Sequence, residues 1–305
     1  MIYTVTLNPS LDYVVNVDKL TMGATNRSAS DATIAGGKGI NVSFLLKELG
    51  IESVAIALIA GYTGQEIKRR IEAKGVKGHY IELEEGTSRI NVKIKERKET
   101  EINAQGPAIP EEKITELMDY LKEVLDVGDI LILAGSIPVS VPKNIYREIA
   151  KFCQPKGVKV VVDAQGSVLH DVINEKPFLI KPNQDELREL FDVQVTTLGE
   201  ANRYVKKLHE MGAKNAIVSL GEAGAILAAE DGQVYSCIAP RGNVVNTVGA
   251  GDSMIAGFIT GLLSNIGYQK ALELGVAAGS ATAFAMELAT KREIQDMFET
   301  IKKGL

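Results

Sequence analysis

The second half of the chain alternates short apolar runs with longer segments in which apolar and polar residues mix. Apolar runs lie at 129–134, 159–163 and 178–180, and a helix is expected between the first two, near 143–152. Strands that pair in parallel need a long crossover between them, and helices supply it. The alternation therefore predicts an α/β fold built on a mostly parallel central sheet.

A glycine-rich turn, Gly249-Ala250-Gly251-Asp252, precedes an apolar run at 254–263 that predicts a buried helix. The first three residues have little or no side chain, and free N–H groups at a helix start favour anions. Asp252 is a candidate base for an attacking hydroxyl. The helix dipole should weaken it as a base, and an Asp here is also a common cap. The turn is therefore either a catalytic anion site or a capped helix start.

A second glycine-rich stretch, Gly36-Gly37-Lys38-Gly39, lies near the N-terminus. Its glycines let backbone amides approach a polar ligand, and Lys38 adds a positive charge. It is not a Walker A loop, because Gly39 stands where Ser or Thr follows the lysine in that motif. A helix is expected from about Asn41, so the stretch predicts a ligand contact at a helix start.

Residues 89–95 alternate strictly between polar and apolar side chains. One face of the expected strand carries Arg89, Asn91, Lys93 and Lys95, and the other face is apolar. The polar face predicts anion recognition, with Arg89 the leading candidate because its planar fork matches phosphate. The alternative is an exposed flap that its charges keep soluble.

Composition narrows the class of protein. The formal net charge is −5, which argues against nucleic acid as the main partner. No apolar run reaches the length of a membrane span, and the N-terminus lacks the basic start of a signal peptide. Cys153 and Cys237 are isolated, without metal-ligand spacing. We therefore expect a cytoplasmic protein with two reduced thiols.

The late glycine turn resembles the C-terminal signature of the ribokinase-like carbohydrate kinases, the PfkB family. That signature usually begins with Asp-Thr, whereas this chain has Asn246-Thr247 followed by Val248. The stretch at 36–42 is similar to the family's N-terminal signature, and further matches extend over nearly the whole chain. The resemblance implies a ribokinase-like three-layer α/β/α fold, with a single kinase domain over 1–305.

The resemblance also implies a small β-sheet lid that closes over the sugar and often forms the dimer contact. Two separate insertions, at about 12–35 and 87–106, would form this lid, and a short strand expected at 99–103 fits it. We therefore expect a homodimer joined through the lid, with neither nucleic acid nor a membrane among its partners.

For the activity, the resemblance implies phosphorylation of a ketohexose phosphate by ATP with Mg²⁺. The phosphosugar branch of the family points first to D-fructose 1-phosphate, giving fructose 1,6-bisphosphate, and second to tagatose 6-phosphate, giving tagatose 1,6-bisphosphate. The sequence does not decide between these sugars. A kinase of an unphosphorylated sugar or nucleoside is a rival with the same fold, and a non-catalytic sugar-phosphate sensor is a rival of another class.

The family's motifs imply roles for individual residues. Asp252 is the expected base, and the amides of Gly249, Ala250 and Gly251 are expected to hold the transferring phosphoryl group. Some substrate residues also have simpler interpretations, as a turn aspartate or a solvated surface arginine. The residues expected to bind the sugar phosphate are Asp12, Arg27, Gly37, Lys38, Asn41, Arg89, Asn91, Lys93, Asn103 and Ser136.

Asn183 and Glu186 lie three residues apart at an expected helix start, on one face. They match the family's Asn-x-x-Glu motif, which is expected to hold Mg²⁺ through water, but a capping box has the same pattern. A separate glycine-containing turn at 219–224 is expected either to bind the nucleotide or to be a plain turn. A small-residue helix at 275–286 is expected to pack near the adenine. The expected nucleotide-binding residues are Lys181, Asn183, Ser219, Leu220, Gly221, Glu222, Ala223, Gly224 and Gly251.

Overall fold

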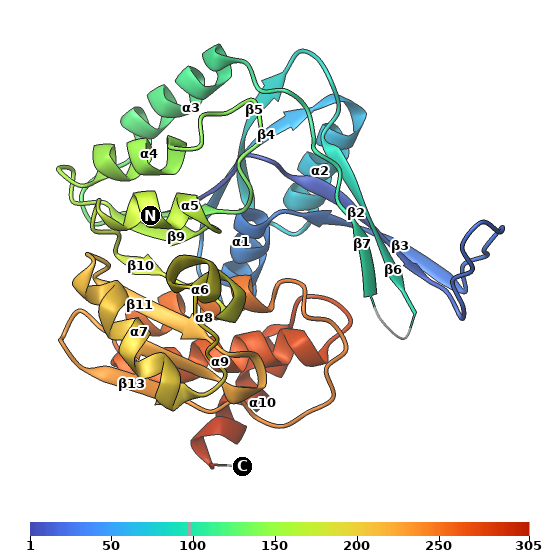
Figure 1. The fold of residues 1–305 in the computed structure, drawn as a ribbon. Helices are drawn as coiled ribbons and strands as arrows, with labels where there is room; N and C mark the ends of the chain where they lie inside the picture. Colours follow the sequence, from blue (N-terminus) through green and yellow to red (C-terminus); the bar gives the residue numbers. More distant parts are fainter. Residues whose placement is uncertain (97–98, 305) are drawn as a thin grey trace.

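A nine-stranded sheet runs through the protein in the computed structural model, which describes residues 1–96 and 99–304 (Figure 1). The strand order is β13-β12-β11-β10-β9-β8-β1-β4-β5. All pairs from β5 to β11 are parallel, whereas β12 and β13 join antiparallel at one edge. The strands are β1 (Ile2–Thr6), β4 (Val54–Ala60), β5 (Lys77–Leu83), β8 (Ile130–Ala134), β9 (Lys159–Asp163), β10 (Leu179–Ile180), β11 (Asn215–Ser219), β12 (Ala225–Ala228) and β13 (Val234–Cys237).

The middle strands of this sheet are buried on both faces. Every residue of β1 and of β8 is buried. Successive side chains of a strand point to opposite faces, so Leu131 and Leu133 enter the core on one side of the sheet, and Ile130 and Ile132 enter the core on the other. Continuous apolar strands of this kind are typical of parallel sheets. The predicted mostly parallel sheet is confirmed.

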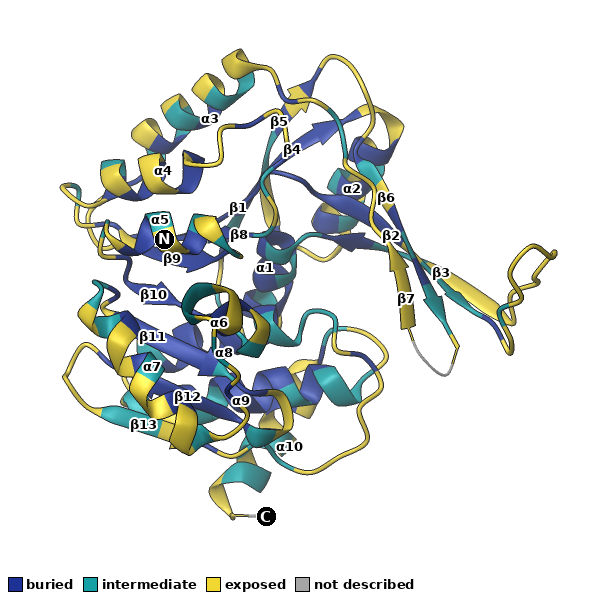
Figure 2. Cartoon of the chain, in the orientation of Figure 1, coloured by how far each residue is buried: buried dark blue, intermediate teal, exposed yellow. Residues whose placement is uncertain are grey.

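Helices cover both faces of the sheet, which confirms the expected three-layer arrangement. Helices α3 to α7 pack on one face, and α1, α2, α8, α9 and α10 on the other, with their outer sides exposed (Figure 2). Within the described ranges, no helix has both the length and the apolar character that a bilayer span requires. The helices are α1 (Lys38–Glu48), α2 (Gly61–Ala73), α3 (Glu111–Val124), α4 (Ile145–Cys153), α5 (Ser167–Ile173), α6 (Gln184–Phe191), α7 (Leu198–Glu210), α8 (Ala250–Leu263), α9 (Tyr268–Phe284) and α10 (Lys291–Lys302).

A second sheet of four strands, the lid sheet, projects from the body beside α2 (Figure 1). Its order is β3-β2-β6-β7; β2 and β6 pair in parallel, and the outer pairs are antiparallel. Its strands come from two separate parts of the chain. They are β2 (Ser10–Asn16), β3 (Ser30–Gly36), β6 (Arg89–Lys95) and β7 (Glu99–Ile102).

Several elements have no counterpart in the sequence prediction: β3, β5, β13 and α5. Strand β3 shows why, because its sequence is Ser-Asp-Ala-Thr-Ile-Ala-Gly and its first half is exposed, so it has no regular apolar period. Helix α9 begins at Tyr268, well before the small-residue segment that marked it in the sequence. The prediction was thus strongest where apolar residues repeat and weakest at sheet edges.

Candidate active site

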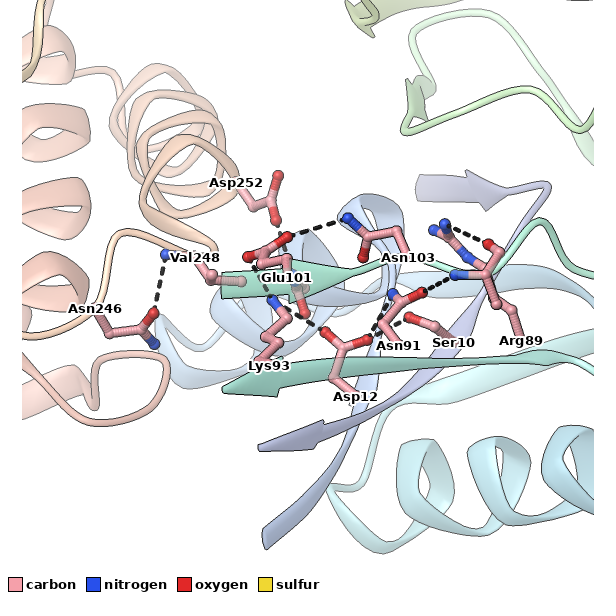
Figure 3. Close-up of polar contacts among 12 residues, drawn as sticks. Ser10, Asp12, Arg89, Asn91, Lys93, Glu101, Asn103, Asn246, Val248 and Asp252 are labelled. Carbon is pink, nitrogen blue, oxygen red and sulfur yellow. Dashed lines mark hydrogen bonds and ion pairs between the residues drawn. The ribbon is translucent and has the colours of Figure 1, made fainter. Parts of the chain in front are cut away.

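A cavity of about 700 Å³ lies between the lid sheet and the carboxyl ends of the central strands, the usual place for ligands of open α/β sheets. Its wall includes Arg89 and Lys93 from β6, and Gly251 and Asp252 from the start of α8. Figure 3 shows the lid side chains and Asp252 in this region. The predicted lid face and the late glycine turn therefore contribute to one site.

Asp252 is buried at the start of α8, and the Asn41 side-chain amide donates a hydrogen bond to its Oδ2 (2.8 Å). Burial, reinforced by the nearby carboxylate of Asp163, raises the pKa of Asp252 to about 6, although Lys38, Asn41 and Lys181 oppose the rise. The sequence predicted the opposite direction from the helix dipole. Burial outweighs the dipole here, so Asp252 is a stronger base than an ordinary aspartate.

Asp163 is a site residue that sequence reasoning did not single out. It ends β9, is almost fully buried, and lies between two ammonium groups: Lys38 Nζ at 3.1 Å from Oδ2 and Lys181 Nζ at 3.4 Å from Oδ1. Burial alone would raise the pKa of Asp163, but Lys181 and Lys38 hold it below its usual range. Its position at the carboxyl end of a predicted buried strand was the available signal.

Asp12 in β2 is held by three side chains of the lid sheet (Figure 3). Ser10 Oγ and Asn91 Nδ2 both donate to its Oδ1, at 2.7 and 2.9 Å, and Lys93 Nζ lies 3.3 Å from Oδ2. Asp12, Asn91 and Lys93 are all buried and all line the cavity. The carboxylate is therefore a fixed acceptor at the cavity wall.

Lys93 has a second carboxylate neighbour, Glu101 of β7, whose Oε1 lies 3.5 Å from Lys93 Nζ. Asn103, exposed at the end of β7, donates from Nδ2 to Glu101 Oε2 at 3.2 Å. Glu101 also lines the cavity, although no sequence pattern pointed to it. One buried ammonium thus lies between two carboxylates (Figure 3).

Arg89 is bonded differently. Its Nε donates to the carbonyl oxygen of Asn8 (3.1 Å) and its Nη1 to that of Ala104 (3.5 Å). Burial lowers the pKa of Arg89, and the more distant Asp12 partly offsets this effect. No carboxylate in the described part of the chain forms an ion pair with its guanidinium. Arg89 is therefore a half-buried cation at the cavity whose nearest carboxylate, Asp12, acts on it without a direct ion pair.

The late glycine turn has a fixed backbone. The Asn246 side chain accepts a hydrogen bond from the Val248 amide (3.1 Å) and donates one to the Met286 carbonyl oxygen (3.3 Å), so Asn fills the place of the usual Asp (Figure 3). Gly249 has a φ of +80° and caps α8, and an added Cβ there would lie 2.5 Å from Leu288. The positive φ favours glycine at this position, and a larger residue would also displace the end of the Leu288 side chain.

The amides of the turn are not equivalent. The Ala250 amide donates to the Thr247 carbonyl oxygen at 3.3 Å, whereas the Gly251 amide has no acceptor among the residues that the structure describes. A Cβ on Gly251 would lie 3.0 Å from Lys181 Nζ, so the ammonium lies directly over the turn. Gly251 and Lys181 together form a compact positive site suited to an anion.

A second cavity, of about 730 Å³, adjoins the first. It is lined by the turn at 219–224 and by α9 residues of the predicted small-residue helix, including Gly279 and Ala283. Leu220 is buried in the core and Ala223 packs against it, so these two predicted nucleotide residues do not line the cavity. The residues that line both cavities are Lys181, Asn183, Thr247 and Gly251.

Asn183 and Glu186 form a capping box at the start of α6, with both reciprocal hydrogen bonds at 2.9 Å. The capping interpretation is therefore confirmed. Asn183 lines both cavities, whereas Glu186 is buried behind them and lines neither. Glu186 Oε1 has no hydrogen-bond partner among the described residues, which leaves one carboxylate oxygen able to accept a further contact.

The other predicted substrate residues fall into two groups. Gly37, Lys38, Asn41 and Ser136 line the first cavity, as do Asn91 and Asn103. Arg27 does not: it is exposed in the loop between β2 and β3, which projects away from the body in Figure 1. The cavity also has polar wall residues that the sequence did not suggest, namely Thr6, Asn8, Ser10, Glu101, Lys143, Asp163, Gln165, Ser167 and Glu189.

Comparison with known proteins agrees with this geometry. The chain matches the model of the pfkB family carbohydrate kinases over residues 6–294. It is 45% identical over 302 residues to the 1-phosphofructokinase of Bacillus subtilis, covering 99% of each chain. It is 33% identical over 308 residues to the tagatose-6-phosphate kinase of Staphylococcus epidermidis, covering 100% of this chain and 98% of that one.

Solved structures extend the likeness to the fold. The phosphofructokinase-2 of Escherichia coli, in complex with substrates and products, has a TM-score of 0.93 to this chain at 27% identity, with 99% of each chain covered. Another structure of that protein is its tetrameric inhibited form.

The three-layer fold, the two adjoining cavities and the family match agree with the resemblance found in the sequence. The chain belongs to the pfkB family of carbohydrate kinases, whose phosphoryl donor is ATP.

Proposed function

We propose that the protein transfers the γ-phosphoryl group of ATP to the free hydroxymethyl group of D-fructose 1-phosphate, giving fructose 1,6-bisphosphate. The observation that carries this proposal is the meeting of two cavities at Lys181 and Gly251, with Asp252 on the side of the lid. The 45% identity to a 1-phosphofructokinase supports the choice of sugar, and the lower identity to a tagatose-6-phosphate kinase makes tagatose 6-phosphate the second candidate.

Asp252 is the catalytic base of this proposal. Its carboxylate accepts the hydroxyl proton while the sugar oxygen bonds to the γ-phosphorus and the bond from that phosphorus to the ADP oxygen breaks. With a pKa of about 6, the group is largely ionised at pH 7 yet more basic than an ordinary aspartate. Because phosphoryl transfer is mostly loose and proton removal comes late, a base of this strength is adequate.

Lys38, Lys181 and the Gly251 amide stabilise the negative charge of the group in transfer. Asp163 positions both lysines, and its own negative charge moderates theirs. Asn41 fixes the orientation of the Asp252 carboxylate through a hydrogen bond to Oδ2. Positioning of this kind is the main protein contribution to phosphoryl transfer.

The lid sheet binds the sugar phosphate. Arg89 holds the phosphate, because its guanidinium has no ion-pair partner among the described residues and its fork matches phosphate oxygens, and Ser136 lies on the same cavity wall. Asp12 accepts hydrogen bonds from sugar hydroxyls. Lys93 matched a phosphate ligand in the sequence, but its two carboxylate neighbours favour a different role, which is to fix Asp12 and Glu101.

Mg²⁺ fits beside Asn183 and Glu186. The free Oε1 of the buried Glu186 and the cavity position of Asn183 provide oxygen groups of the kind that this ion takes, directly or through water. When bound, the ion would neutralise part of the charge on the ATP phosphates. The nucleotide itself occupies the second cavity, between Gly224 and Gly279.

The test of the proposed function is a coupled assay of ADP release with a panel of sugars. We expect kcat/KM for fructose 1-phosphate to exceed that for tagatose 6-phosphate, fructose 6-phosphate and unphosphorylated fructose. A higher value for tagatose 6-phosphate would move the assignment to the second candidate. A higher kcat/KM for unphosphorylated fructose would contradict the assignment of a sugar phosphate as substrate. No ADP release with any sugar would favour a non-catalytic sensor.

We also propose that the chain is one kinase domain with a discontinuous lid, and that it forms a homodimer through that lid. The apolar face of β6 supports the dimer, because Ile90 and, on β7, Ile102 are 41% and 60% exposed, whereas the polar face is turned to the cavity. The two cysteines, buried and not joined in a disulfide, are consistent with the cytoplasm.

A further inference from the structure

The cavity face of the lid sheet carries a second carboxylate besides Asp12. Glu101 of β7 lies directly opposite Lys93 of β6 in the strand register, and both side chains line the cavity that contains Asp252. The Glu101 side chain is 36% exposed, so a ligand in the cavity can reach it. The mechanism proposed above needs no such group at this place.

Neighbouring side chains hold the Glu101 carboxylate in position. Lys93 Nζ lies 3.5 Å from Oε1, and Asn103 Nδ2 donates to Oε2 at 3.2 Å (Figure 3). A carboxylate oxygen can accept more than one hydrogen bond, so each oxygen keeps capacity for a ligand. Fixed carboxylates at a cavity wall are suited to hydroxyl groups, which donate, and unsuited to phosphate groups, which at neutral pH only repel them.

The charges divide the cavity face of the lid into two ends. At one end, the Lys93 side chain is 6% exposed and shared by Asp12 and Glu101, so two negative charges face one positive charge. At the other end, the hydrogen bonds of Arg89 within the described part of the chain go to backbone carbonyl oxygens. Arg89 and Lys93 are four residues apart on one strand, or about 13 Å along it. A phosphate is therefore attracted to one end and repelled from the other.

We propose that Glu101 determines substrate specificity: it accepts hydrogen bonds from ring hydroxyls of the sugar and keeps phosphate away from Lys93, which directs the phosphate to Arg89. The inference rests on the proposed function, since it assumes a phosphosugar. With the phosphate fixed at Arg89 and the reacting hydroxyl at Asp252, fructose 1-phosphate and fructose 6-phosphate bind with the ring reversed. The two isomers then present different hydroxyls to Glu101, which allows this residue to distinguish them.

The test compares Glu101→Gln with a matched control, Glu99→Gln. Glu99 is on the same strand, exposed, and does not line the cavity, so the control makes the same charge change outside the site. For E101Q we expect KM for fructose 1-phosphate to rise at least about tenfold, the loss of one hydrogen bond to a charged group, with kcat changed less than about threefold. The preference for fructose 1-phosphate over fructose 6-phosphate should fall, whereas E99Q should match the wild type.

Three results would overturn the inference. A lower KM in E101Q would mean that Lys93, once released, binds the phosphate. Equal effects on both isomers would remove the role in specificity, and E101Q kinetics equal to those of E99Q would remove Glu101 from the site. An unchanged affinity for ATP, measured by calorimetry, shows that E101Q is folded, because the nucleotide cavity lies apart from β7. If the wild-type protein fails to use fructose 1-phosphate, the proposed function fails instead.

Discussion

At the scale of single residues, the chemistry depends on how a buried carboxylate is kept reactive. Asp252 is surrounded by Asp163, which opposes its ionisation, and by Lys38 and Lys181, which favour it. The two lysines also pair with Asp163, so their charges are shared between two carboxylates. The net result is a raised pKa for Asp252 and a lowered pKa for Asp163. Two aspartates influenced by the same two lysines therefore have different roles.

The pKa of Asp252 predicts a pH dependence for catalysis. We expect kcat, measured with both substrates saturating, to fall about tenfold per pH unit below about pH 6, because the base becomes protonated. Asp163 does not contribute in this window, since its lowered pKa keeps it ionised. Thermal unfolding at each pH separates titration from loss of structure. A kcat that stays constant down to pH 5 in a folded protein would contradict this role.

The residues of the site differed in how well the sequence revealed them. Asp252 and the glycines beside it stand in a compact motif, so their spacing alone indicated an anion site. Asp163 and Glu101 are single acidic residues at the end of a strand and within one, without a local pattern. The order of the central sheet brings Asp163 to Lys38 and Lys181. The register of β6 with β7 brings Glu101 to Lys93.

At the scale of elements, the lid sheet reverses the usual relation between polarity and burial. In β6 the polar Asn91 and Lys93 are buried, whereas the apolar Ile90 is exposed. The strict alternation was predicted correctly from the sequence. Which face turns to the cavity was not decided by the alternation, because a charged face is equally suited to solvent and to an anionic ligand.

The exposed apolar face of β6 and β7 allows assembly to be tested separately from folding. We expect Ile102→Asp to convert a dimer to monomers, because burying a new carboxylate in an apolar contact is unfavourable. Val127→Asp is the control, since Val127 is also an exposed apolar residue but follows α3, outside the lid. Light scattering after gel filtration measures the mass of each. A monomeric wild type, or an I102D that remains dimeric, would contradict assembly through this face.

At the scale of the whole molecule, two cavities adjoin at one glycine turn. The lid side holds residues suited to a sugar phosphate, and the α9 side holds a cavity of nucleotide size. The late glycine turn lies between them. The fold class was predictable from the repeated apolar runs, but the juxtaposition depends on the sheet order, in which β9, β10 and β11 lie side by side.

The most direct measurement of the central claim is the turnover of Asp252→Asn with ATP and fructose 1-phosphate. The account predicts that kcat falls by about 10²- to 10⁴-fold, the usual range for a general base, while the affinity for ATP is retained. The variant should unfold no more readily than the wild type at pH 7.5. The raised pKa means that ionised Asp252 weakens the folded state above about pH 6, and the amide removes that charge. A folded Asp252→Asn protein with near-normal kcat would contradict the account.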